Sequence, residues 1–196
     1  MAHRVTVEEG ILIGGSGGTA VAAALQIAEN LTAQDLVVVL IPDSGRGYLS
    51  KVFDKSWMAN MGFSRQEGPT IADLLDQRTK DQSELAYVSP ESNLEEAISI
   101  MQERGLPGIP VANGEMPLAA AEVMGSVFQD SLLEESSKTD QPSTRKVQDV
   151  MGPNMPTVGV GESLTVAATK LENSQVLLVL DDGQPRSLLT RSDLAG

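Results

Sequence analysis

An internal repeat in the second half of the chain constrains the fold more than any other feature. Residues 70–75 match residues 146–151, and residues 87–94 match residues 157–164. In both copies a short strand and a turn are followed by an amphipathic helix and by two further strands. A unit this small cannot bury all of its apolar surface alone, so we expect the copies to pack together and to leave clefts between them.

The spacing of apolar and turn residues locates the elements of each copy. Strands are predicted at residues 108–111 and 176–179, and each runs into a hairpin-type turn, Asn113-Gly114 or Asp182-Gly183. The last strand of each copy ends where another helix begins. The helix that precedes these strands is predicted from apolar side chains at helical intervals: Leu94, Ala97, Ile98 and Met101 in the first copy, and Leu164, Ala167, Ala168 and Leu171 in the second.

The first 62 residues also predict alternating strands and helices. Residues 10–13 and 36–41 are short apolar runs typical of buried strands, and a glycine-rich turn and an Ala-rich helix separate them. Two strands do not complete an α/β domain. We therefore expect either a partner chain or sequence upstream of Met1 to complete this sheet, and we favour the second.

These features place the chain in the α/β class and divide it into five parts. The parts are a first segment at residues 1–62, a linker at 63–69, a first repeat at 70–133, a Ser-, Thr- and charge-rich linker at 134–145, and a second repeat at 146–196.

Composition excludes several classes of function. The net charge is −13, from 27 acidic and 14 basic residues, and no Lys- or Arg-rich run is present, so nucleic acid and anionic membranes are not expected partners. There is no cysteine and only one histidine, His3, so no metal site is expected. Met1-Ala2-His3-Arg4 lacks the apolar region typical of a signal peptide, and no apolar run is long enough to span a membrane, so we expect a cytoplasmic protein.

Thr190 and Asp193, at the end of the second repeat, place a hydroxyl and a carboxylate on one face of a predicted helix start. A carboxylate can accept hydrogen bonds from both hydroxyls of a ribose, and a helix N-terminus offers N–H groups to an anion. An ordinary N-cap with an acidic first turn explains the same spacing. The spacing alone favours the N-cap.

The repeat resembles the CBS domain, two copies of which form a Bateman pair. Val158, Glu162-Ser163-Leu164, residues 176–179 and residues 188–193 carry the resemblance. It implies that Thr190 and Asp193 hold the ribose of an adenosyl ligand, that the pair forms a homo-oligomer, and that the adenine side is lined by Leu106, Ile109 and Leu188.

The first copy departs from this pattern. Phe128 stands where the family has the hydroxyl, and Ser131 stands where it has the Asp. The resemblance therefore implies that one of the two clefts is degenerate.

The run Gly14-Gly15-Ser16-Gly17-Gly18 precedes the Ala-rich helix and could cradle a phosphate with its backbone N–H groups. It lacks the lysine of a Walker A loop, and a tight strand-to-helix turn explains it equally well.

Residues 8–18 and 35–51 resemble the end of the catalytic domain of the cystathionine β-synthase family. Its members are fold-type II pyridoxal-phosphate enzymes, and many carry a Bateman pair directly after this segment. The resemblance implies an incomplete catalytic fragment in which Ser16, with Gly14 and Gly15, contacts pyridoxal 5'-phosphate, the serine hydrogen-bonding to the pyridine nitrogen.

The family's Schiff-base lysine lies upstream of the matching segment. None of the six lysines here has the expected small-polar context at a strand end: Lys51, Lys55, Lys80, Lys138, Lys146 and Lys170. We therefore expect this chain neither to bind the cofactor nor to catalyse by itself.

The resemblance implies the regulatory part of an enzyme that condenses serine with homocysteine through a pyridoxal aminoacrylate. S-adenosylmethionine or a related adenosyl compound would bind between the repeats and change the enzyme's activity. Two alternatives stay open. One is a stand-alone AMP or ATP sensor that docks on a partner through residues 1–62, and the other is a cysteine synthase relative with a different second substrate.

Overall fold

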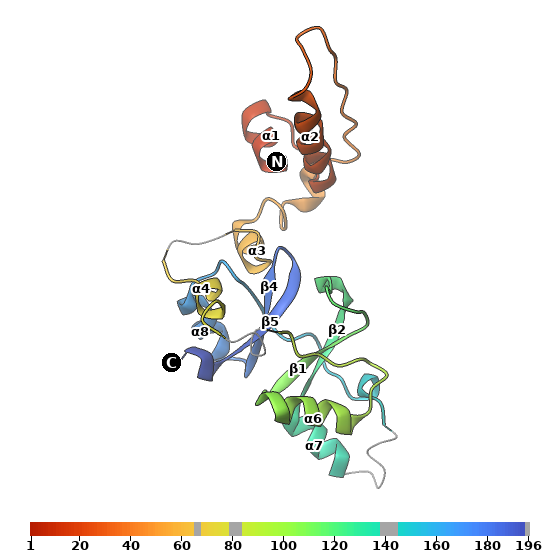
Figure 1. Cartoon of the computed structure of the whole chain (residues 1–196), viewed down its shortest axis with the longest axis vertical. Helices are drawn as coiled ribbons and strands as arrows, with labels where there is room; N and C mark the ends of the chain where they lie inside the picture. The colour runs from red at the N-terminus through yellow and green to blue at the C-terminus, as the bar shows by residue number, and fades with distance from the viewer. Residues whose placement is uncertain (65–67, 79–83, 138–144, 195–196) are drawn as a thin grey trace. The chain divides into compact units, whose positions relative to one another are not determined.

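The computed structural model describes residues 1–64, 68–78, 84–137 and 145–194. Its contacts divide the chain into two compact units, Met1–Met58 and Ala59–Gly196 (Figure 1). Each unit has its own packing.

The first unit is built from helices. Helix α1 (Ala2–Glu9) packs on α2 (Gly15–Ala28), and the 3-10 helix η1 (Gly45–Tyr48) follows a long connection. Gly18 permits the close approach of the two α-helices, because a Cβ atom at this position would lie 2.5 Å from the backbone nitrogen of Ala2. The predicted glycine-rich turn is therefore wrong from Gly15 onward: it forms the first turns of α2.

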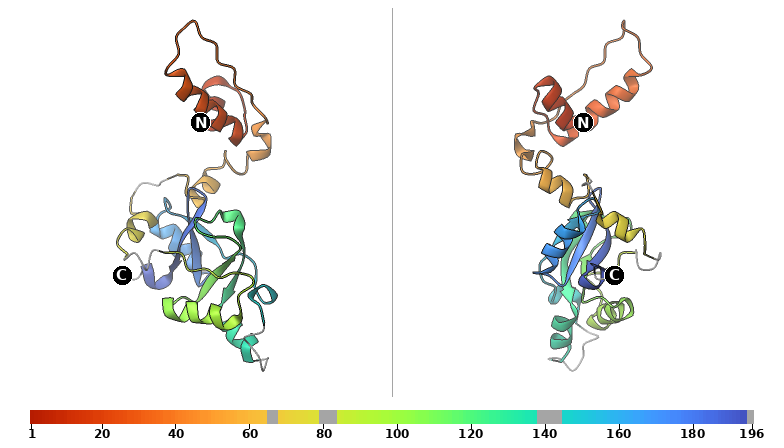
Figure 2. Two further views of the ribbon diagram at one scale, coloured as in Figure 1. Left: turned by 45° about the vertical axis from the view of Figure 1, so that its right-hand side comes forward. Right: turned by 90° about the vertical axis from the view of Figure 1, so that its left-hand side faces the viewer.

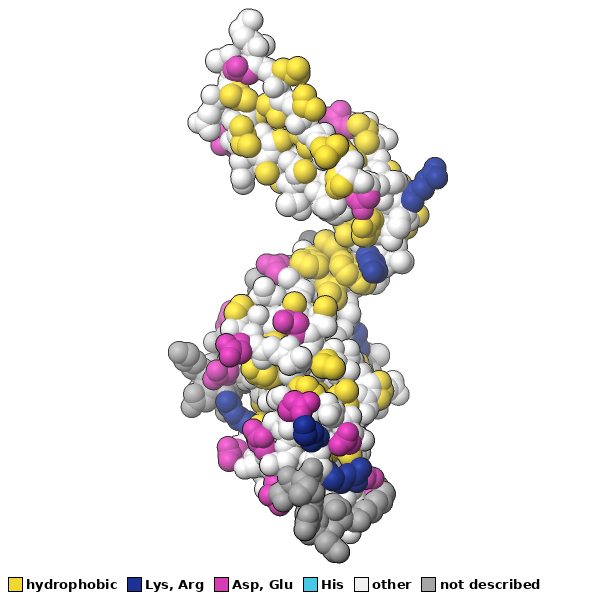
Figure 3. Space-filling model, turned by 90° about the vertical axis from the view of Figure 1, so that its right-hand side faces the viewer, with side chains coloured by type: hydrophobic (Ala, Val, Ile, Leu, Met, Phe, Trp, Pro, Cys, Tyr) yellow, Lys and Arg dark blue, Asp and Glu magenta, His cyan; other side chains and the backbone are white. Residues whose placement is uncertain are grey.

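The two strands predicted in this unit are also wrong. Ile13 forms a single bridge with Ser44, and residues 36–41 are irregular. Leu36, Val38 and Leu40 are each more than four-fifths exposed, and Figure 3 shows apolar side chains spread over this unit. A strand needs backbone partners on a neighbouring strand, and the described residues of this unit provide none for residues 36–41.

The second unit contains the two predicted repeats. The first repeat has α6 (Leu94–Arg104), β1 (Gly108–Ala112), η2 (Ala120–Glu122), β2 (Val123–Phe128) and α7 (Gln129–Ser137). The second has η4 (Val147–Asp149), β3 (Thr157–Gly159), α8 (Leu164–Leu171), β4 (Val176–Asp181), β5 (Gln184–Thr190) and η5 (Arg191–Leu194). The mixed α/β fold expected for the repeat is confirmed.

The two sheets share one topology. Strands β4 and β5 are antiparallel and β3 is parallel to β4; β1 and β2 are antiparallel, and Val88 makes a single parallel bridge with Val111 at the place that β3 has in the other sheet. The Asp182-Gly183 turn closes the β4–β5 hairpin with positive φ at both residues, as predicted. The Asn113-Gly114 hairpin is wrong, because a longer connection that includes η2 joins β1 to β2.

The leading segments of the repeats are exchanged. Helix α4 (Ile71–Leu75), at the start of the first repeat, donates the N–H of Ile71 to the carbonyl of Glu162 in the second repeat. Val147, at the start of the second repeat, donates its N–H to the carbonyl of Ser92 in the first. Figure 2 shows α4 beside α8, and Ile71 packs in one buried cluster with Leu171. Neither repeat completes its core without the other.

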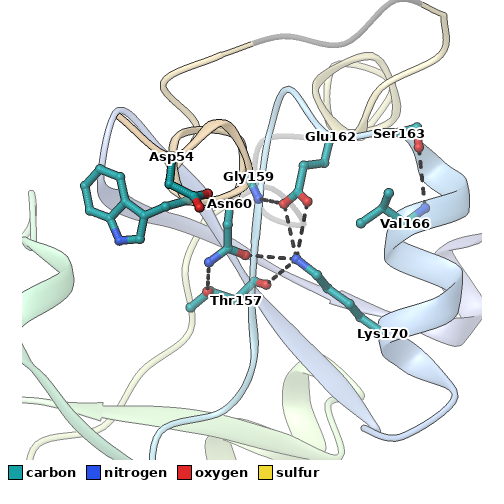
Figure 4. Close-up of polar contacts among 9 residues, drawn as sticks. Asp54, Asn60, Thr157, Gly159, Glu162, Ser163, Val166 and Lys170 are labelled. Carbon is teal, nitrogen blue, oxygen red and sulfur yellow. Dashed lines mark hydrogen bonds and ion pairs between the residues drawn. The ribbon is translucent and has the colours of Figure 1, made fainter. Parts of the chain in front are cut away.

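The last residues of α3 (Lys55–Asn60), which belong to the second unit, are also anchored on the second repeat (Figure 4). Lys170 on α8 donates to the side-chain oxygen of Asn60 (2.9 Å) and to the carbonyl of Thr157 (3.0 Å), and it lies 3.3 Å from a carboxylate oxygen of Glu162. The amide nitrogen of Asn60 in turn donates to the hydroxyl of Thr157 (2.8 Å). Gly159 leaves room for this contact, since a Cβ atom there would lie 1.8 Å from the carbonyl oxygen of Ala59.

No helix in the described part of the chain is long and apolar enough to cross a membrane. Nor do the described residues contain a cluster of three or more His, Cys, Asp or Glu side chains placed to hold a metal ion.

The substitution Gly159→Ala should lower the free energy of unfolding by about 1–3 kcal/mol, because the new methyl group forces the docked segment away from the second repeat. The matched control is Gly152→Ala, whose Cβ atom would meet nothing closer than 3.9 Å and should change stability by less than about 1 kcal/mol. Urea unfolding measures both. Equal effects of the two substitutions would contradict the observed close approach.

Candidate ligand-binding site

Two adjoining clefts open beside Thr190, which lines both. The first, here called the Thr190–Asp193 cleft, has a volume of about 570 Å³ and is lined among others by Arg78, Ala86, Leu106, Leu188, Thr190 and Asp193. The second, here called the Phe128 cleft, has a volume of about 670 Å³ and includes Phe128, Pro107, Asn173, Ser174, Thr190 and Arg191. Clefts are therefore present beside the paired repeats, but the two share Gly105, Thr190 and Ser192, and Ser131 is not among the residues that line them.

The end of β5 and the turn η5 bring Thr190 and Asp193 together. One carboxylate oxygen of Asp193 (Oδ2) accepts from the backbone N–H of Thr190 (2.6 Å) and from its hydroxyl (2.7 Å). The Thr190 hydroxyl also lies 2.7 Å from that of Ser192. The local interaction expected of a helix cap is thus formed, and both residues of the predicted ribose site face one cleft.

Arg78 forms an ion pair with the other carboxylate oxygen of Asp193. Its Nη2 lies 2.6 Å from Asp193 Oδ1, and its Nη1 donates to the carbonyl of Leu188 (3.0 Å) and to the hydroxyl of Ser187 (3.3 Å). The arginine side chain is only 12% exposed. The sequence analysis did not identify Arg78, because it follows α4 outside the repeated motif and reaches Asp193 only through the exchange of leading segments.

The adenine side of the predicted site is formed in part. Leu106 and Leu188 line the Thr190–Asp193 cleft on opposite repeats. Ile109 is fully buried in β1 and belongs to the core beneath the cleft. Its contact with a ligand stays a prediction.

Thr190 lines the Phe128 cleft too, but Asp193 is not among the residues that line it. The Phe128 ring lies over Gly108, where a Cβ atom would be 2.6 Å from the ring, and Ser131 is exposed on α7. The Phe128 cleft is therefore large enough for a ligand, but it differs from the Thr190–Asp193 cleft in that Asp193 does not line it.

Ser16, Gly14 and Gly15 lie at the start of α2 in the first unit, where Asp43 is their neighbour. The Ser16 hydroxyl donates to Asp43 Oδ1 (3.2 Å), and a Cβ atom on Gly14 would lie 2.1 Å from the same oxygen. Asp43 Oδ2 accepts from the hydroxyl of Tyr48 (2.6 Å), and this hydrogen bond raises the pKa of Tyr48 above its ordinary value.

These residues do not fit pyridoxal phosphate as they are arranged here. The hydroxyl predicted to meet the pyridine nitrogen already donates to a carboxylate, and that carboxylate brings negative charge to the helix N-terminus that would otherwise favour a phosphate.

Both repeats are similar to a known protein family. Residues 81–119 and 147–196 match the CBS domain family. A CBS-pair protein of Arabidopsis thaliana has a similar structure, with a TM-score of 0.52 and 24% identity over 65% of this chain and 92% of that protein. This likeness is one of fold.

Curated relatives extend the similarity to the first unit. Cystathionine β-synthase of Mus musculus is 31% identical over 144 residues, which are 71% of this chain and 26% of that protein. The enzyme of the same name in Dictyostelium discoideum is 27% identical over 209 residues, covering 99% of this chain and 40% of that protein. The chain therefore spans well under half the length of these relatives.

A double-mutant cycle tests the ion pair in the cleft. The variants Arg78→Met and Asp193→Asn, alone and combined, should show a coupling energy of roughly 0.5–3 kcal/mol, because either single change leaves a part-buried charge without its partner. The free energies of unfolding come from urea titration at low salt. Strictly additive effects would mean that the two side chains do not interact in solution.

Proposed function

Because the second unit carries a tandem pair of CBS domains, we propose that it is a ligand-sensing regulatory module and that an adenosyl ligand binds in its Thr190–Asp193 cleft. The observation that carries this proposal is the convergence on one cleft of Thr190, Asp193 and the apolar side chains of Leu106 and Leu188.

The lining suits the two parts of a nucleoside. Leu106 and Leu188 offer apolar surface to a flat base, and they come from different repeats, so a base held between them would bridge the pair. Asp193 can accept hydrogen bonds from ribose hydroxyls, and Thr190 supplies a hydroxyl beside it. A ligand bound here would therefore favour one arrangement of the two repeats over others.

We also propose that the module regulates a pyridoxal-phosphate enzyme of the cystathionine β-synthase kind, which would join serine to homocysteine. The similarity to the Dictyostelium enzyme, which extends over nearly the whole chain, supports this. In such an enzyme the cofactor would act as an electron sink for replacement at the β-carbon. Since Ser16 is engaged by Asp43, we assign the cofactor site to a longer polypeptide rather than to these residues alone.

A stand-alone nucleotide sensor is the second candidate. Its support is the self-contained packing of residues 59–196, where each leading segment completes the core of the other repeat. Both candidates use the same cleft, so a test of the cleft applies to both. The cysteine synthase alternative and the homo-oligomer stay predictions.

The variant Thr190→Val should bind adenosyl ligands roughly 5- to 100-fold more weakly, because it removes the hydroxyl while keeping the shape of the side chain. Adenosine, AMP, ATP and S-adenosylmethionine are titrated in turn into the full chain by calorimetry. The matched control is Ser131→Ala, which removes an exposed hydroxyl of α7 outside the lining of both clefts and should leave affinity unchanged. Loss of binding in the control alone, with full affinity in Thr190→Val, would contradict the placement of the ligand beside Thr190.

A further inference from the structure

Arg78 is the least exposed charged group in the described lining of the Thr190–Asp193 cleft. The guanidinium is held by the hydroxyl of Ser187, the carbonyl of Leu188 and the carboxylate of Asp193. The burial of Ile71 and Leu75 against the second repeat holds α4 in place, and Arg78 lies three positions after the end of this helix. Arg78 is thus a fixed component of the cleft.

Both oxygens of Asp193 are in use before any ligand arrives. Oδ2 accepts from Thr190 and Oδ1 faces Arg78 at 2.6 Å. Ribose hydroxyls that bind Asp193 must therefore share it with Arg78 or displace the guanidinium. A displaced guanidinium in this largely buried position would lose its only carboxylate partner among the described residues, and leaving such a charge uncompensated is costly.

A ligand with its own negative charge removes this cost. A phosphate group beside the ribose could accept charge-assisted hydrogen bonds from the guanidinium, while the ribose hydroxyls donate to Asp193. A neutral nucleoside offers no such exchange, and a sulfonium group would add a second positive charge near Arg78. The other charged side chains of the cleft, Glu84, Glu103 and Arg104, are exposed, so solvent screens them more strongly.

We propose that Arg78 is a specificity-determining residue of this cleft: it exchanges the carboxylate of Asp193 for a phosphate of the ligand, and so selects adenine nucleotides over adenosine and over S-adenosylmethionine. This inference rests on the proposed function, namely that the cleft binds an adenosyl group. It adds which class of adenosyl ligand is preferred and names the side chain responsible.

The test is calorimetric titration of the full chain with AMP, adenosine and S-adenosylmethionine. The unsubstituted chain should bind AMP at least about tenfold more tightly than either of the other two, since one charge-assisted contact is worth on the order of that factor. Arg78→Gln should weaken AMP binding by about the same factor and leave adenosine binding equal or tighter, so that the preference for AMP is lost.

Two further variants keep the result interpretable. Arg78→Lys retains the positive charge without the planar fork and should keep part of the preference for AMP. Arg186→Gln removes an arginine that pairs with Asp181 outside the cleft and should leave the preference intact. Retained adenosine binding shows that the Arg78→Gln chain is folded.

Equal binding of AMP and adenosine by the unsubstituted chain would overturn the inference, as would tighter binding of S-adenosylmethionine or a preference for AMP that survives Arg78→Gln. In each of these cases the proposed ligand cleft still stands, because an adenosyl compound binds. Absence of binding by all three ligands would instead overturn the proposed function together with the inference.

Discussion

The two-sided burial of β4 is the constraint on which the second unit depends. Val176, Leu178 and Leu180 face the core shared with the first repeat, while Leu177 and Val179 face the cluster formed with α4 and α8. A strand with apolar side chains on both faces requires cover on both. The first repeat supplies one cover and the exchanged helix α4 contributes to the other. The exchange also carries Arg78 to the cleft beside β5.

Much of this fold could be predicted from the sequence because its signals are local. Helical spacing located α6 and α8, and the Asp182-Gly183 turn located the β4–β5 hairpin. Residues 36–41 were mispredicted because an apolar run gives no information about whether a partner strand is present. The pairing of Thr190 with Asp193 could be predicted, since the two residues are three positions apart in the sequence. The contact of Arg78 with Asp193 could not be predicted, because it depends on packing between distant segments.

The cleft is linked through hydrogen bonds to the segment that follows the first unit. Arg191, in the same turn as Asp193, donates to the carbonyl of Leu171 at the end of α8 (2.7 and 2.9 Å). Lys170, one residue earlier in α8, donates to Asn60. A ligand that changes the partners of Asp193 acts on a turn that is directly bonded to this helix. Such contiguous contacts give a regulatory ligand a physical connection to residues 59–63, and their energetic coupling is a separate quantity to be measured.

The central claim is that an adenosyl ligand binds between the repeats at Thr190 and Asp193. Amide hydrogen exchange with and without AMP tests this claim most directly. Binding in this cleft should slow exchange in the peptides that contain residues 104–109 and 187–193, because the ligand would hold both repeats together there. Peptides covering residues 128–131 should exchange at the same rate in both states. Protection confined to residues 128–131 and 173–176, with none at residues 187–193, would contradict the account.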